Sequence, residues 1–136
     1  MNKSIVVVLD TNIFISAILY KGTPFKVLQL CIVKNEIRIA ISPELLAELI
    51  GKLKYKFGIA NQTLENLKTE IESGALYVLP EYKTRICRDA DDNAIIDLAI
   101  CAKAGFIITG DKDLLSIKTY KKIKILTAAE FLELKS

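Results

Sequence analysis

The 136-residue chain contains no histidine. This absence excludes Ser-His-Asp and Cys-His catalysis, zinc sites that use histidine, and RNA cleavage by a histidine acid or base. Any hydrolytic chemistry must therefore use carboxylates, lysines, hydroxyl groups or a bound metal ion.

Cysteine is scarce, and long hydrophobic runs are missing. Cys31, Cys87 and Cys101 are scattered without a Cys-x-x-Cys pair, so neither a disulfide framework nor a zinc site is indicated. The apolar run at 5–9 is far too short for a signal sequence or a membrane span. We therefore expect a cytoplasmic protein with reduced cysteines and no membrane association.

Size and charge allow one globular domain with a mildly basic surface. The chain length suits a single domain over 1–136, and 51% apolar residues are ample for a core. The net charge of +3 permits a nucleic-acid partner without demanding one. Lysines cluster at positions 52, 54 and 56 and again at 118, 121, 122 and 124, which most simply indicates solvated faces.

Apolar runs and helix signals alternate along the chain. Strands are predicted at 5–9, 37–41, 76–79, 106–108 and 124–126, and helices at 25–33, 42–53, 61–72, 93–104 and after Thr127. The continuous β-branched run at 5–9 is typical of a parallel strand buried on both faces. This order predicts an α/β fold, a three-layer α/β/α sandwich with a mainly parallel, Rossmann-like sheet.

Local signals predict where several helices begin and end. Ser42 followed by Pro43 is a strong helix start, and Thr127 is expected to cap the last helix, which carries Phe131 and Leu134. Gly105 is expected to be the C-cap of the helix before the fourth strand.

Acidic residues follow two of the predicted strands. Asp10 comes directly after the first strand, and Asp111 and Asp113 lie just beyond the strand at 106–108. Ligands of open α/β sheets bind at the carboxyl ends of the strands, so these side chains are expected at one edge.

Two helices are expected to bring further carboxylates to that edge. Asp92 shares a helix face with Ile95 and Ile96, at the end nearest the carboxyl edge, and Glu48 flanks the apolar stripe of its helix. Each Asp alone could equally be a turn or capping residue, and Glu48 alone could be a solvated helix residue. Their convergence indicates a site for Mg²⁺ or Mn²⁺, which would activate water and orient a phosphate in the absence of histidine.

With these residues in place, the chain resembles the PIN domain family, most closely the VapC-like toxins of prokaryotic toxin–antitoxin systems. Four segments carry the resemblance: Val8-Leu-Asp-Thr-Asn12, Ser42-Pro-Glu-Leu-Leu-Ala-Glu48, Arg88-Asp-Ala-Asp-Asp-Asn-Ala-Ile95 and Ile108-Thr-Gly-Asp-Lys-Asp-Leu-Leu115.

The resemblance implies a metal-dependent endoribonuclease that acts on RNA, forms a homodimer and pairs with an antitoxin protein. The acids matching the family's quartet are Asp10, Glu48, Asp92 and Asp111, with Thr11, Asn12 and Thr109 as supporting polar residues. Asp113 is a further metal-ligand candidate, either beside Asp111 or sharing its role. Apolar residues outside the core-facing stripes, such as Tyr20, Phe25, Tyr55 and Phe57, are candidates for the dimer contact.

Two other functions remain open at this level. A phosphatase with an aspartyl nucleophile usually has a second Asp two residues after the first, and Asn12 occupies that position here. A non-catalytic module that binds metal or RNA is the other alternative.

Overall fold

The computed structural model describes residues 5–33 and 37–135, which form a six-stranded sheet with the strand order β3-β2-β1-β4-β6-β5. The strands are β1 (Ile5–Leu9), β2 (Ile37–Ile41), β3 (Leu76–Tyr77), β4 (Phe106–Ile108), β5 (Thr119–Tyr120) and β6 (Ile123–Leu126). Neighbouring strands run parallel except β5 and β6, which are antiparallel.

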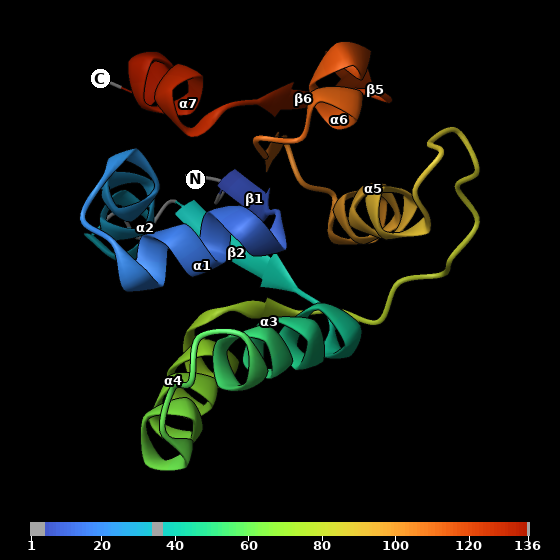
Figure 1. The fold of residues 1–136 in the computed structure, drawn as a ribbon. Helices are drawn as coiled ribbons and strands as arrows, with labels where there is room; N and C mark the ends of the chain where they lie inside the picture. The colour runs from blue at the N-terminus through green and yellow to red at the C-terminus, as the bar shows by residue number, and fades with distance from the viewer. Residues whose placement is uncertain (1–4, 34–36, 136) are drawn as a thin grey trace.

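Helices cover both faces of this sheet (Figure 1). They are α1 (Thr11–Leu19), α2 (Thr23–Val33), α3 (Pro43–Tyr55), α4 (Asn61–Gly74), α5 (Ala90–Ala102), α6 (Lys112–Ile117) and α7 (Ala128–Lys135). Helix α5 packs against β1, β2 and β4, whereas α2 packs on β2 and α7 on β6. The predicted three-layer α/β/α fold with a mainly parallel sheet is therefore confirmed.

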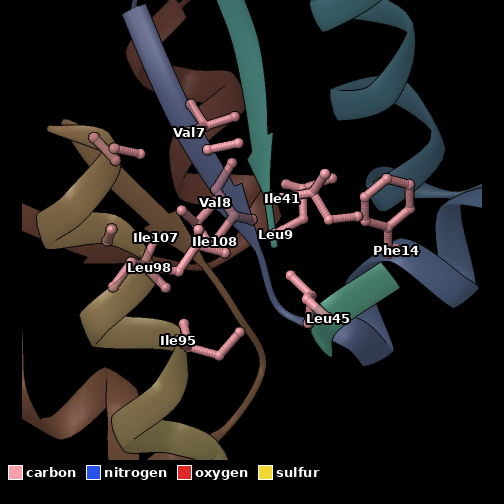
Figure 2. Packing of buried hydrophobic residues seen from close by; sticks show 14 of the residues in the cluster. Val7, Val8, Leu9, Phe14, Ile41, Leu45, Ile95, Leu98, Ile107 and Ile108 are labelled. Carbon is pink, nitrogen blue, oxygen red and sulfur yellow. The ribbon is translucent and has the colours of Figure 1, made fainter. Parts of the chain in front are cut away.

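The central strand β1 is buried from both sides. Val7, Val8 and Leu9 have no exposed surface. Figure 2 shows Ile95 of α5 on one side of β1 and Phe14 of α1 on the other. Alternation of apolar and polar residues would expose polar groups to one of these layers, which is why the strand is apolar throughout.

The predicted helix starts are confirmed by hydrogen bonds. The Leu45 amide donates to Ser42 Oγ at 3.1 Å at the start of α3. At the start of α7, the Glu130 amide donates to Thr127 Oγ1 at 3.1 Å and the Thr127 amide donates to Glu130 Oε1 at 2.9 Å. These reciprocal bonds form a capping box.

Several local predictions were wrong. The C-cap of α5 is Lys103, in the left-handed conformation at φ 55°, and the Gly105 amide instead donates to Val6 O at 2.9 Å within the sheet. The helix ends early because the chain must enter β4 in register with β1. The short antiparallel strand β5 was not predicted. Over the described part of the chain, no helix has the length and apolar character needed to cross a membrane.

Candidate active site at the carboxyl edge of the sheet

The carboxyl ends of β1 and β4 bring Asp10 and Thr109 together. Leu9 pairs with Ile108 across the two strands, and the Asp10 amide donates to Ile108 O at 3.0 Å. The buried Thr109 hydroxyl then donates to Asp10 Oδ2 at 2.7 Å. This contact joins residues 99 positions apart and fixes the orientation of the Asp10 carboxylate.

The turn after β4 orients Asp111 by the same kind of contact. The Asp111 amide donates to Thr109 Oγ1 at 3.0 Å, so this one hydroxyl connects both acidic segments. Asp111 is the N-cap of α6, and its Oδ1 accepts the Asp113 amide at 2.8 Å. Asp111 is therefore a capping residue as well as a candidate ligand of the site.

Asp92 lies in the first turn of α5, where Asp89, and neither Asp91 nor Asp92, is the N-cap. Its side chain is only 5% exposed, and Oδ2 accepts no hydrogen bond from any described residue. The pKa of Asp92 is raised to about 7, first by burial and then by the charge of Asp111 and the hydrogen bond shared with it. A buried carboxylate oxygen without a donor is costly unless a cation or a proton satisfies it.

Asp92, Asp111 and Asp113 form the acidic triad of the site. Each offers a carboxylate oxygen, and these oxygens lie within 4.8 Å of one another. Mg²⁺ and Mn²⁺ take oxygen ligands of this kind. The unsatisfied Asp92 oxygen is therefore consistent with a divalent cation bound among these three side chains.

Asp10 and Glu48 lie beside the triad, with no oxygen in the common 4.8 Å group. Burial raises the pKa of Asp10, the Thr109 hydrogen bond opposes this, and the charges of Asp111 and Glu48 add to the increase. Glu48 forms an ion pair with Lys52 at 3.1 Å on α3. The four acids of the predicted quartet thus lie at one edge, with Glu48 ion-paired to Lys52 and outside the common group.

A small cavity of about 100 Å³ adjoins Asp10 and Glu48. Thr11 is buried and lines this cavity, whereas the Asn12 side chain is exposed. Tyr82 also lines it, and the hydrogen bond from Tyr82 lowers the pKa of Glu44.

Sequence reasoning missed the residues that hold the 78–89 segment beside this edge. Asp97, buried on α5, accepts the Thr84 amide at 3.0 Å and the Thr84 hydroxyl at 2.6 Å. Asn93 accepts the Cys87 amide at 2.9 Å and donates to Cys87 O at 3.1 Å. A signal was available, since Asn93 and Asp97 are polar residues four apart on a helix whose remaining positions after Asp92 are apolar.

Sequence reasoning also gave Arg88 no role. Its Nη2 lies 3.0 Å from both carboxylate oxygens of Asp113, so the site contains a cation supplied by the chain itself.

Comparison with known proteins places this site in a family. Among curated proteins, an uncharacterised protein of Methanocaldococcus jannaschii is 39% identical over 93% of this chain and 89% of its own length. The solved structure of VapBC-1 from nontypeable Haemophilus influenzae matches 92% of this chain and 99% of that chain, with a TM-score of 0.62 and 18% identity. VapBC2 from Rickettsia felis, solved bound to a DNA fragment from its promoter, matches 89% of this chain and 97% of that chain, with a TM-score of 0.56 and 20% identity. These structures share the fold, and the PIN domain model matches residues 6–113, so the chain belongs to the PIN domain family, as its sequence motifs predicted.

Proposed function

We propose that this protein is a divalent-metal-dependent endoribonuclease that hydrolyses RNA phosphodiester bonds. The observation that carries the proposal is the acidic triad with the buried, unsatisfied Oδ2 of Asp92 at the carboxyl edge of a PIN domain. A buried carboxylate beside two half-buried ones is costly for folding, so this arrangement is best explained by a cation.

Asp92, Asp111 and Asp113 are the residues that would hold Mg²⁺ or Mn²⁺, with Asp10 beside them. When bound, such an ion supplies an activated water and absorbs negative charge that develops on the phosphate oxygens. The chain's own residues pre-organise the site. Thr109 holds Asp10 and the Asp111 turn with a single hydroxyl, so both carboxylates are oriented before any ligand arrives.

The proposal extends to a biological setting. The solved structures that share this fold carry the name VapBC, which supports a toxin role for this chain and a partner antitoxin protein. We further propose a cytoplasmic homodimer. Large apolar side chains of the described surface, among them Tyr20 at 62% and Tyr55 at 82% exposure, would be partly buried in such a dimer.

A nuclease assay with rigorously repurified protein tests the proposal. Labelled RNA is incubated with Mg²⁺, with Mn²⁺ or with excess EDTA, and wild type is compared with Asp10→Asn, Asp92→Asn and the exposed neighbour control Asp91→Asn. Cleavage should require metal and fall at least ~100-fold in Asp10→Asn and Asp92→Asn, the scale of losing one key electrostatic group. Asp91→Asn should stay active. Near-wild-type cleavage by folded Asp10→Asn and Asp92→Asn would reject the assignment.

A further inference from the structure

The carboxyl edge of the sheet presents a strongly negative surface to any RNA. Carboxylates gather there from several elements: Asp10, Glu44, Glu48, Asp91, Asp92, Asp111 and Asp113. A phosphodiester is itself an anion, and one divalent ion offsets only part of this charge. A cation of the chain placed at the same edge would therefore assist binding.

The backbone on both sides of Arg88 is held to the start of α5. Cys87 exchanges two hydrogen bonds with the Asn93 side chain, at 2.9 and 3.1 Å. Asp89 caps the helix by accepting the Asp91 amide at 2.9 Å, and its carbonyl accepts the Asn93 amide at 3.2 Å. The hydrogen bonds of Cys87 and Asp89 therefore hold the Arg88 backbone in place, so only its side chain has to be ordered when a ligand binds.

The segment containing Arg88 runs beside the acidic triad. Arg88 Nη2 lies 3.0 Å from both carboxylate oxygens of Asp113, which belongs to that group. In keeping with this position, burial raises the pKa of Cys87, and the charges of Asp92, Asp111 and Asp113 raise it as well.

The Arg88 side chain is oriented and at the same time accessible. A single nitrogen, Nη2, donates to both oxygens of Asp113 at 3.0 Å, while the side chain is 88% exposed. Arg88 makes no other hydrogen bond within the described residues. An exposed ion pair contributes little to folding stability, but it leaves further N–H donors in a planar fork suited to phosphate oxygens.

We propose that Arg88 binds a phosphate of the RNA beside the scissile bond, and that Asp113 positions Arg88 for this contact. In this assignment the main role of Asp113 is to hold the Arg88 side chain in place. The metal ion is bound mainly by Asp92 and Asp111. The inference rests on the proposed nuclease function and adds to it the residue that contacts substrate phosphate.

The test measures kcat/KM for a labelled single-stranded RNA in Mn²⁺ at several salt concentrations. The variants are Arg88→Gln, Arg88→Lys, Asp113→Asn and the double variant, with Lys124→Gln as the charge-matched control. Lys124 is exposed and lies on β6, where its amide bonds Gly105 O at the opposite edge of the sheet. Melting temperature with and without Mn²⁺ is recorded for each protein.

Loss of one phosphate contact on a single strand should reduce the slope of log(kcat/KM) against log[salt] by about 0.7 in magnitude. Arg88→Gln should show this change and roughly a tenfold or greater loss of kcat/KM, mainly through KM, since a charge-assisted hydrogen bond is removed. Arg88→Lys should recover the slope but only part of the rate. Asp113→Asn should lose less of its kcat/KM than Arg88→Gln, and the double variant should lose no more than Arg88→Gln. In every variant, Mn²⁺ should still raise the melting temperature as it does in the wild type.

The outcomes separate this inference from the proposed function. If the wild type cleaves RNA and Arg88→Gln keeps the wild-type salt slope, or if Lys124→Gln changes it equally, the phosphate contact is refuted and the nuclease assignment stands. If Asp113→Asn abolishes the Mn²⁺ response, Asp113 is a metal ligand and its positioning role is refuted. If the wild type cleaves no RNA in metal, the proposed function itself fails, and this inference with it.

Discussion

Replacement of Asp92 by Asn should make the metal-free protein more stable. The Asp92 carboxyl is 5% exposed, and its pKa is raised from 3.8 to about 7 by burial and by Asp111. In the unfolded chain the group titrates near its ordinary value. Between these two values the native state therefore binds more protons than the unfolded state, and stability must fall as pH rises.

The size of the effect follows from the pKa difference. About three pKa units correspond to roughly 4 kcal/mol of unfolding free energy. The wild type has lost all of this stability at a pH above the folded-state pKa, and it retains all of it at a pH below the unfolded-state pKa. Asn has nearly the same volume and no charge, and its amide can donate to the Asp111 carboxylate. We expect Asp92→Asn to gain about 1 to 4 kcal/mol at pH 8 in EDTA, the lower figure allowing for the cost of burying an amide.

Thermal unfolding followed by circular dichroism measures this gain. For a domain of this size, 1 kcal/mol shifts the melting temperature by about 3 °C, so a rise of roughly 3 to 12 °C is expected at pH 8. The difference from wild type should shrink as pH falls towards 4. Millimolar Mn²⁺ should then stabilise the wild type by mass action and the variant much less.

Asp91→Asn is the matched control, because Asp91 is the exposed neighbour in the same helical turn. Asp91→Asn should show neither a higher melting temperature in EDTA nor a weaker stabilisation by Mn²⁺. A melting temperature of Asp92→Asn that is unchanged or lower at pH 8 in EDTA, together with a wild-type response to Mn²⁺, would refute the reasoning about a buried, charged metal ligand.

Three further predictions concern the products, the fold and the assembly. RNA cleavage should leave a 5′-phosphate and a 3′-hydroxyl and should tolerate replacement of the 2′-hydroxyl at the scissile nucleotide, because the chain has no histidine to activate that hydroxyl; mass spectrometry of the ends decides this, and cyclic phosphate termini would contradict it. Asp97→Ala should lower the unfolding free energy by about 3 kcal/mol, since it leaves the buried Thr84 amide and hydroxyl unpaired; urea unfolding measures the loss, and a change below about 0.5 kcal/mol would argue against the contact. Sedimentation equilibrium at tens of micromolar should show a homodimer that weakens in Tyr55→Ser; a monomer under these conditions would end the dimer proposal.

Much of the fold could be predicted because its signals are local. The run at 5–9 is apolar on both faces, which specifies a central strand, and Ser42 followed by Pro43 starts a helix wherever it lies in space. Predictions failed where packing competed with a local preference. Gly105 is the better C-cap by conformation, yet the register of β4 with β1 makes Lys103 adopt the left-handed turn.

For the candidate site, the sequence by itself determined that Asp10 and Asp111 lie at the same edge of the sheet. Asp10 and Asp111 follow parallel strands, and parallel strands end at the same edge, so chain order alone predicts their proximity.

Only the tertiary structure decided what environment each acid has. Asp92 is buried with an unsatisfied oxygen, and Glu48 lies outside the acidic triad. Asp113 accepts a hydrogen bond from Arg88, which is 25 residues away in the sequence. Burial and charge proximity depend on how helices and the 78–89 segment pack over the sheet. Those contacts join distant parts of the chain, and no local pattern of residues encodes them.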